Sequence, residues 1–322
     1  MRRTTGYAVA FGVATIVTTA ATLVLMKGIG PAPDPEGCEA TVNDTTLSMK
    51  TEQAENAALI AAISVKRGMP ARAASIAIAT AYQESKLVNI DYGDRDSVGL
   101  FQQRPSQGWG TRGEILNRSH SINAFYDALE KVDGYETMRI TEAAQAVQRS
   151  GFPEAYQDHA ADGRVLASAL TGETRPAAFT CVLRHDSVTE PTTLDDTGLT
   201  RRAAVVRRDL EKAFGDLALG GFEPGGAKSG HMPGSAHYEG RALDVFVRPI
   251  SEENNRRGWS IASYLVANAD RLRIQNVIFD DQIWSAGARS EQGWRDYAPP
   301  SSSSGDQAIL EHRDHVHVDV AG

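Results

Sequence analysis

The chain lacks an excess of positive charge. Its 322 residues include 33 Lys and Arg against 41 Asp and Glu, a formal net charge of −8 at pH 7. Proteins that bind nucleic acid or anionic membrane surfaces carry an excess of basic side chains. The balance therefore gives no support for nucleic acid as a partner and no reason to expect binding to anionic lipid. The composition is otherwise typical of globular domains, with 41% hydrophobic and 23% charged residues.

Cysteine is also scarce. The sequence has two cysteines, Cys38 and Cys181. In an oxidising compartment a pair of this kind favours a disulfide. The two flank the first domain predicted below, so the bridge is expected to join its two ends. Two buried free thiols are the alternative.

The N-terminus lacks a clear signal-peptide cleavage site. Arg2 and Arg3 precede an uncharged run over residues 4–26, which Lys27 closes. The run is long enough to span a bilayer as a helix, and no A-x-A site follows it. We expect an uncleaved single-pass signal anchor over residues 1–27, with the arginines on the cytoplasmic side of the cell membrane and the later domains extracellular. Secretion after signal cleavage is the alternative.

The rest of the chain divides by composition into linkers and two domains. Residues 28–46 are rich in Pro, Gly and acidic side chains, and residues 173–198 in Thr, Pro and Asp, so both are predicted linkers. Helical spacing predominates over residues 47–172, which predicts an all-α domain. Residues 199–322 mix helical and strand patterns, which predicts an α+β domain with a small antiparallel sheet. Helices are expected over 51–67, 71–86, 121–131, 140–149, 163–170, 199–214 and 258–272, and strands over 241–248, 276–279, 282–284 and 316–320.

One predicted helix ends in a glutamate motif. The helix ends in AYQESKL, residues 81–87, and a polar loop leads to VGLFQQRP, residues 98–105. Over about residues 51–170 the chain resembles the lysozyme-like lytic transglycosylases and goose-type lysozymes. The resemblance implies a lysozyme-like (α+β) fold and makes Glu84 the general acid/base at a glycosidic oxygen. It also implies that Gln102 and Gln103 line the sugar cleft and that Tyr156 forms its wall.

The same stretch departs from the family pattern. An Ala-Tyr-Asn motif is replaced by AQAVQRSG, residues 144–151, where Gln148 or Ser150 is a possible substitute. No partner carboxylate is evident, because the nearby aspartates all lie in the loop over residues 89–97. Lytic and hydrolytic cleavage therefore both stay open, and a solvated helix-end acid is the alternative for Glu84.

Histidine is concentrated near the C-terminus. Five of the eight histidines, at positions 231, 237, 312, 315 and 317, lie in the last third. On a strand, His315 and His317 point to the same face. Zinc prefers imidazole and carboxylate ligands, and a catalytic site uses three protein ligands. Two segments can thus present His237, Asp244 and a histidine of the last strand to one Zn²⁺.

These two segments carry the second resemblance. PGSAHYEGRALD, residues 233–244, and the HRDHVH ending, residues 312–317, resemble the zinc D-Ala-D-Ala carboxypeptidase-like (M15-type) peptidases, which act on peptidoglycan stems. The resemblance implies His237, Asp244 and His317 as zinc ligands and either Asp314 or His315 as the general base. His312 is expected to stabilise an oxyanion or to orient a ligand. His231 is expected to be a loop residue, although it could reach the cleft.

Both resemblances lead to the same polymer. We therefore expect a membrane-anchored peptidoglycan hydrolase that cleaves glycan strands through Glu84 and peptide stems through water activated by zinc. Two alternatives remain. One is a non-catalytic wall-binding or scaffold protein of an envelope assembly, and the other is a protein in which only the peptidase domain is active.

Overall fold

The computed structural model describes residues 36–184, 192–301 and 305–322. Residues 36–322 form one compact unit. Within the described ranges no helix is long and apolar enough to cross a membrane. This finding corrects the predicted fold class, which began with a transmembrane helix. The run at 4–26 to which that helix was assigned lies outside the described residues.

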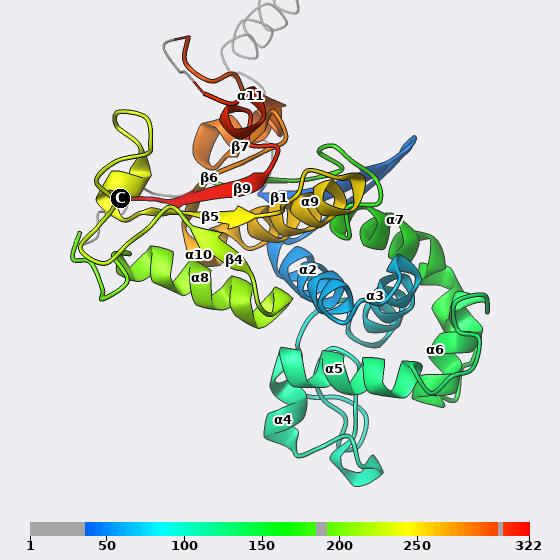
Figure 1. The fold of residues 1–322 in the computed structure, drawn as a ribbon. Coiled ribbons are helices and arrows are strands. Elements are labelled where there is room, and N and C mark those ends of the chain that lie inside the picture. The colour runs from blue at the N-terminus through cyan, green and yellow to red at the C-terminus, as the bar shows by residue number, and fades with distance from the viewer. Residues whose placement is uncertain (1–35, 185–191, 302–304) are drawn as a thin grey trace, which may run out of the picture. The chain divides into compact units, whose positions relative to one another are not determined.

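The first half of the described chain combines a helical bundle with a small sheet (Figure 1). Its helices are α2 (Thr51–Lys66), α3 (Ala71–Ser85), α4 (Arg112–Leu116), α5 (Arg118–Leu129), α6 (Ile140–Gln148) and α7 (Ala160–Leu170). Its strands are β1 (Gly37–Val42), β2 (Thr45–Met49) and β3 (Phe179–Val182), in the antiparallel order β2-β1-β3. The expectation of an all-α domain is thereby corrected to helices plus a three-stranded sheet.

Alanine-rich helices pack closely in this bundle. Helix α3 begins directly after Pro70 and ends at Ser85, and the next residue, Lys86, has a left-handed φ of 57° that stops the helix. A Cβ atom added at Gly163 would lie 2.6 Å from the Ser75 carbonyl oxygen, so α3 and α7 approach too closely for a side chain there. This packing fixes the first half of α3, the helix that carries Glu84, against α7.

The predicted disulfide is present. Cys38 on β1 lies opposite Cys181 on β3, and the two sulfur atoms are bonded. Strands β1 and β3 lie in the stretches predicted as the linkers 28–46 and 173–198. Both strands are short and flanked by residues typical of loops, so their pairing across the chain, rather than local periodicity, makes them strands.

The second half is an α+β assembly. Its helices are α8 (Arg201–Phe214), α9 (Glu252–Ala267), α10 (Ala269–Leu272) and α11 (Gln307–Leu310). Its strands are β4 (Ala218–Gly220), β5 (Ala242–Phe246), β6 (Ile274–Phe279), β7 (Gln282–Ser285), β8 (Arg295–Asp296) and β9 (His315–Val320). They form one antiparallel sheet in the order β4-β5-β9-β6-β7-β8, against which α8 and α9 pack. The predicted small antiparallel sheet is confirmed.

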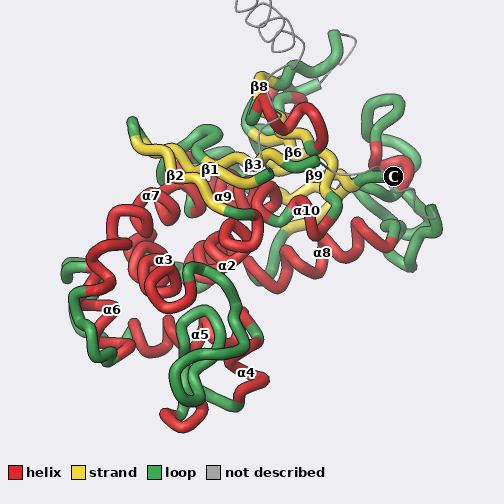
Figure 2. Tube along the Cα trace, turned by 180° about the vertical axis from the view of Figure 1, so that it is seen from behind, coloured by secondary structure: helices red, strands yellow, loops and turns green. Residues whose placement is uncertain are grey.

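The two halves share a continuous buried core. Helix α9 contacts α2, α7 and β3 of the first half (Figure 2). At this seam the Ser260 hydroxyl donates to the Leu170 carbonyl oxygen at 2.8 Å. The indole N–H of Trp284 donates to the Cys181 carbonyl oxygen at 3.0 Å. One cluster of buried apolar residues runs from Cys38 to Val320. The two halves are therefore packed together rather than joined by a free tether.

Candidate functional site

Two neighbouring strands and a short helical turn build the metal-capable site. Strands β5 and β9 pair so that Asp244 lies directly opposite His317. The 3-10 turn Ala236–Glu239, which precedes β5, supplies His237. Exposure of the three residues is only 3% for His237, 6% for Asp244 and 8% for His317. Polar groups buried this deeply need partners, and these three have one another.

The three side chains converge on one point. His237 Nε2 lies 3.0 Å from His317 Nδ1 and 3.3 Å from Asp244 Oδ1, and His317 Nδ1 lies 3.1 Å from Asp244 Oδ1. Around a tetrahedral zinc ion with bonds near 2.0–2.1 Å, ligand atoms are about 3.3 Å apart. The three atoms thus form a triangle of the size of one face of that tetrahedron. The residues present fit a metal ion of this kind.

A second layer of groups orients these ligands. His237 Nδ1 lies 2.7 Å from the Gly221 carbonyl oxygen, which can only accept, so Nδ1 carries the proton and Nε2 is free to bind a cation. His317 Nε2 lies 3.4 Å from Asp319 Oδ2, and Asn276 donates to both oxygens of that carboxylate at 3.0 Å. Each imidazole therefore presents one nitrogen to the cluster and uses the other for support.

The charges of the cluster respond to burial and to hydrogen bonds. Burial alone would raise the pKa of Asp244, but the neighbouring imidazoles of His237 and His317 hold that pKa far below its usual range. Burial alone would lower the pKa of His317, but the carboxylates of Asp244 and Asp319 raise it to about 9. The two carboxylates thus favour positive charge on the imidazole beside them.

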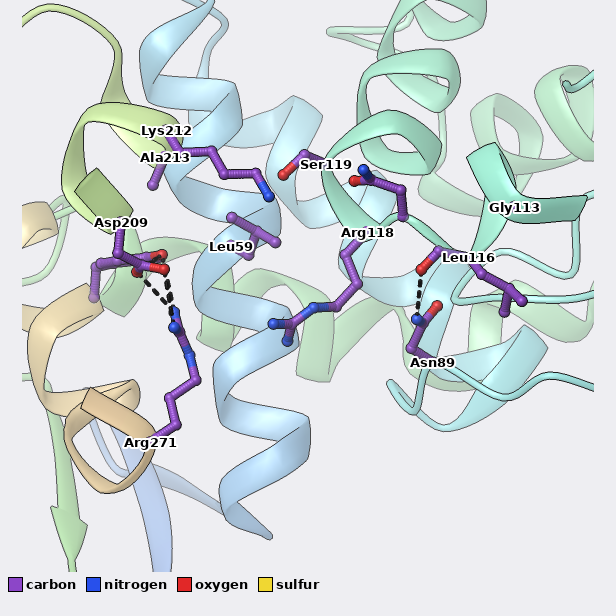
Figure 3. Close-up of a pocket in the computed structure, with 12 residues that line it drawn as sticks. Leu59, Asn89, Gly113, Leu116, Arg118, Ser119, Asp209, Lys212, Ala213 and Arg271 are labelled. Atoms are coloured by element: carbon purple, nitrogen blue, oxygen red, sulfur yellow. Dashed lines mark hydrogen bonds and ion pairs between the residues drawn. The ribbon is translucent and has the colours of Figure 1, made fainter. Parts of the chain in front are cut away.

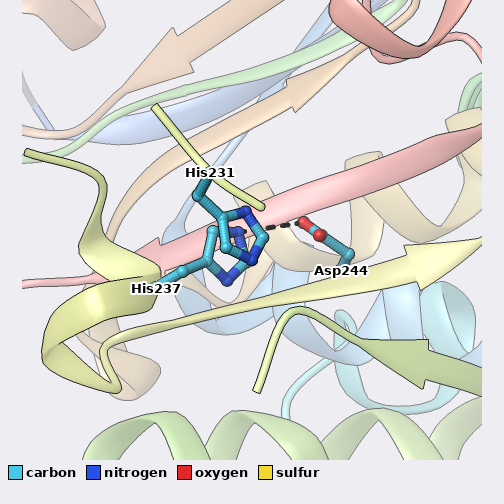
Figure 4. Close-up of side chains that lie close together, drawn as sticks. All are labelled: His231, His237 and Asp244. Atoms are coloured by element: carbon cyan, nitrogen blue, oxygen red, sulfur yellow. Dashed lines mark ion pairs between the residues drawn. The ribbon is translucent and has the colours of Figure 1, made fainter. Parts of the chain in front are cut away.

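The cluster also includes a histidine that the sequence analysis set aside. The ligand atoms of His231, His237 and Asp244 all lie within 4.8 Å of one another (Figure 4). The His231 ring stacks on the His237 ring with centroids 3.9 Å apart and planes 15° apart. His231 lies in a glycine-rich segment without periodicity, so sequence spacing offered no way to place it.

The two candidate bases occupy different places. His315 Nε2 lies 3.9 Å from Asp244 Oδ1, so it faces the metal-capable cluster. Its other nitrogen, Nδ1, lies 2.7 Å from Asp314 Oδ1, while Asp314 Oδ2 accepts from Arg248 at 2.6 Å. Burial alone would raise the pKa of Asp314, but these hydrogen bonds lower it. Asp314 is therefore placed to orient His315, and the His315 Nε2 atom faces the metal-capable cluster.

His312 lies beside this pair. Its ring centroid is 4.7 Å from that of His315 and 5.8 Å from that of His317. Burial and the neighbouring imidazoles lower the pKa of His312 to about 3, so the ring is neutral. Its Nδ1 lies 3.2 Å from the Leu310 carbonyl oxygen and therefore carries the proton. His312 Nε2 is then a hydrogen-bond acceptor. An oxyanion needs a donor, so this nitrogen is better suited to orienting a donor group.

A second centre forms around Glu84 at the end of α3. Tyr156 donates its hydroxyl hydrogen to Glu84 Oε1 at 2.7 Å, and Gln148 Nε2 donates to the same oxygen at 3.2 Å. Gln148 also donates to the Phe101 carbonyl oxygen at 2.8 Å. Burial and the charge of Glu84 raise the pKa of Tyr156, so its phenol stays a donor. The structure thus brings the predicted Glu84 and Tyr156 together, with Gln148 donating to Glu84 and the Ser150 side chain next to Tyr156.

The two predicted cleft glutamines are engaged elsewhere. Gln102 has a left-handed φ of 47°, and its amide donates to the carbonyl oxygens of Tyr92 and Gly99 at 3.3 and 3.2 Å. Gln103 is only 2% exposed and donates to the Ser121 carbonyl oxygen at 3.2 Å. Gln102 therefore links parts of the loop over residues 89–103 to one another. Gln103 anchors this loop to α5 and is buried rather than lining a cleft.

The loop aspartates do not supply a partner carboxylate. Asp96 accepts from Arg104 at 2.7 Å and from the backbone N–H of Ser106 at 2.8 Å, and these hydrogen bonds strongly lower its pKa. Across the described ranges no hydrogen bond or ion pair joins Glu84 to a second acid. The centre therefore has one carboxyl group, held by two donors.

A pocket of about 420 Å³ lies at the seam between the halves (Figure 3). On one wall Arg271 donates to both oxygens of Asp209 at 2.9 and 2.7 Å. On the other wall Asn89 donates to the Leu116 carbonyl oxygen at 2.9 Å. The residues that line this pocket include no predicted site residue. The pocket is a gap in the seam, separate from both centres.

Comparison with known proteins bears on the second half of the chain. No curated protein matches the sequence. Residues 195–308, which include His231, His237 and Asp244, match the family model described as VldE, C-terminal domain.

Proposed function

We propose that this protein is a peptidoglycan hydrolase with two centres, a zinc peptidase centre and a glycan-cleaving centre. The observation that carries the proposal is the triangle of His237, Asp244 and His317, whose ligand atoms lie 3.0–3.3 Å apart. A buried triangle of two imidazoles and one carboxylate is a donor set typical of catalytic zinc. The resemblance of residues 233–244 and 312–317 to zinc peptidases acting on peptidoglycan stems gives the substrate class.

In the peptidase centre His237, Asp244 and His317 would hold the ion. When bound, zinc supplies a Lewis acid that polarises a peptide carbonyl and activates water. His315 holds its proton on Nδ1 toward Asp314 and keeps Nε2 toward the site, so it can accept the proton of the attacking water. Arg248 keeps Asp314 ionised and in place for this role.

In the glycan centre Glu84 is the acid. Two donors, Tyr156 and Gln148, occupy Oε1, so Oε2 is the oxygen that can exchange a proton with a substrate. No hydrogen bond from the described residues reaches Oε2, which leaves it available to a glycosidic oxygen. A single acid with no acidic partner supports general acid/base cleavage without a nucleophilic carboxylate, and hydrolytic and lytic outcomes both fit this chemistry.

The disulfide supports an exported location. Bonds such as Cys38–Cys181 persist in oxidising compartments and are reduced in the cytosol. Peptidoglycan also lies outside the cytoplasm, so the proposed substrate and the disulfide agree on an extracellular site of action.

Digestion of purified peptidoglycan tests the proposal. Products of the wild type, Glu84→Gln and His317→Ala are compared by mass spectrometry. We expect glycan cleavage to disappear in Glu84→Gln alone and peptide cleavage to disappear in His317→Ala alone, because the two centres share no residue. Binding to the wall without any cleavage by the wild type would instead identify a scaffold protein. A wild-type digest that contains only glycan products or only peptide products would show that a single centre is active.

A further inference from the structure

A glycine-rich segment carries His231 over the metal-capable triangle. Between β4 and the turn that holds His237, five glycines have left-handed φ angles, namely Gly221, Gly225, Gly226, Gly230 and Gly234. Glycine adopts these angles without steric cost, and it also gives a segment many accessible backbone states. This segment, residues 221–234, is called the His231 loop below.

The base of the loop is fixed to the site. The Gly221 carbonyl oxygen accepts from His237 Nδ1 at 2.7 Å. A Cβ atom added at Gly221 would lie 2.3 Å from the His237 ring and 2.9 Å from Asp244 Oδ2. The backbone at Gly221 thus approaches the ligands more closely than any other residue type allows. Movement of the rest of the loop would therefore alter the surroundings of the metal-capable site.

The tip of the loop is held in a closed position. Tyr238 accepts from the His231 backbone N–H at 3.1 Å and donates its hydroxyl hydrogen to the His231 carbonyl oxygen at 2.5 Å. With its backbone held in this way, His231 stacks its ring on that of His237. Tyr238 therefore helps to hold His231 over the site through two hydrogen bonds to its backbone.

His231 lies beside two of the three residues of the triangle, His237 and Asp244. Three ligands leave one tetrahedral position free, and in a catalytic site water or substrate takes it. The His231 ligand atom lies within 4.8 Å of those of His237 and Asp244. Ligand atoms around zinc are about 3.3 Å apart, so the widest separation in this trio exceeds that spacing by at most about 1.5 Å. The parallel rings show that binding also requires a turn of the His231 side chain, which glycines on both sides permit.

We propose that His231 is a removable fourth ligand, which closes the peptidase centre at rest and leaves it when the His231 loop opens. This inference rests on the metal site of the proposed function and adds a resting state to it. With four protein ligands the metal has no open position, and a peptide substrate gains access by displacing the loop. The Tyr238 hydrogen bonds set how readily the loop opens.

Measurements of metal binding test the fourth-ligand role of His231 directly, without an activity assay. The full chain is stripped of metal and titrated with Zn²⁺ against a chromophoric chelator, and a second sample is titrated with Co²⁺ and followed by visible absorption. We expect His231→Ala to bind Zn²⁺ at least about tenfold more weakly than the wild type, since loss of even a supporting partner of a ligand costs 10–100-fold. We also expect the Co²⁺ spectrum of His231→Ala to change, and added imidazole to restore it.

Three controls accompany the titration. His231→Gln keeps the size of the side chain and is expected to match His231→Ala in zinc affinity, which guards against a folding defect in the alanine variant. His120→Ala removes a histidine of the helical half and is expected to bind like the wild type. Tyr238→Phe keeps His231 but removes both hydrogen bonds to its backbone, and it is expected to weaken zinc binding less than His231→Ala.

The outcomes separate this inference from the proposed function. A wild type that binds Zn²⁺ tightly, with His231 variants of equal affinity and an unchanged Co²⁺ spectrum, overturns the fourth-ligand role and leaves the three-ligand centre intact. A wild type that binds neither ion overturns both proposals.

Discussion

The two centres of this molecule are built in opposite ways. The proposed peptidase centre draws His237, Asp244 and His317 from paired strands and an adjoining turn, and its candidate ligand atoms lie 3.0–3.3 Å apart. The proposed glycan centre draws its groups from α3, α6 and the turn Ala155–His159, and rests on two donors to a single oxygen of Glu84. The first centre assembles a site for a cation, whereas the second orients one acid.

The contrast predicts different tolerance to substitution. A cation site depends on several ligands at once, so the loss of one ligand removes the centre. An acid held by two donors loses its orientation in steps, because each donor contributes a separate hydrogen bond. Both centres nevertheless share one core, so a global loss of stability is expected to reach them together.

The largest expected effect is the loss of a metal ligand. We predict that Asp244→Ala weakens zinc binding by more than about 100-fold, since removal of a direct ligand exceeds the 10–100-fold cost of losing a supporting partner. Asp319→Asn is the matched variant, because Asp319 contacts the His317 nitrogen that points away from the triangle. Its zinc affinity is expected to fall about tenfold. Competition with a chelator measures both. Equal losses in the two variants would show that Asp244 is not a direct ligand.

The next effect sharpens the choice of base within the peptidase centre. We predict that His315→Gln lowers peptide cleavage by about 10²–10⁴-fold, the usual contribution of a general base. Asp314→Asn is expected to lower it less, because His315 stays in the site and loses only its orienting carboxylate. The rates of peptide release from wall fragments at saturating zinc measure this. A larger loss in Asp314→Asn than in His315→Gln would reverse the two roles.

A third change tests whether the two centres depend on one core. The disulfide spans 143 residues, and its removal in Cys38→Ser/Cys181→Ser is predicted to lower the free energy of unfolding by about 2–5 kcal/mol. Because the buried core is continuous, denaturant unfolding followed by circular dichroism and by tryptophan fluorescence is expected to give coincident transitions. Separate transitions for the two halves would show that they unfold as independent domains.

The smallest effect probes the stepwise loss in the glycan centre. Tyr156→Phe removes one donor from Glu84, and a hydrogen bond is worth about 0.5–1.5 kcal/mol. We therefore predict a loss of glycan cleavage of up to about tenfold, with peptide cleavage unchanged. Tyr126→Phe is the matched control, since the Tyr126 hydroxyl donates to the Ile60 carbonyl oxygen inside the bundle. Equal glycan cleavage by Tyr156→Phe and the wild type would remove Tyr156 from the centre.

Local patterns were sufficient to predict the secondary structure that frames both centres. Helices α2 and α3 and strand β9 match their predicted ranges to within a residue. Strand alternation also placed His315 and His317 on one face, and the register confirms that His317 faces Asp244. These features depend on neighbours along the chain, which a sequence displays directly.

Features that depend on distant contacts could not be predicted in this way. Strands β1 and β3 form because they pair across the disulfide, and both lie in stretches read as linkers. Gln103 was expected in a cleft but is buried, because the loop turns its side chain toward Ser121. His231 reaches the metal-capable cluster through a glycine-rich loop, whose course no spacing rule describes.

The most direct test of the two-centre account is product analysis of purified peptidoglycan digested by the wild type before and after metal removal. The account predicts that a chelator abolishes peptide cleavage and leaves glycan cleavage unchanged, and that added Zn²⁺ restores the peptide products. Peptide cleavage that persists in the metal-free protein, or a wild-type digest without peptide cleavage at any zinc concentration, would contradict it.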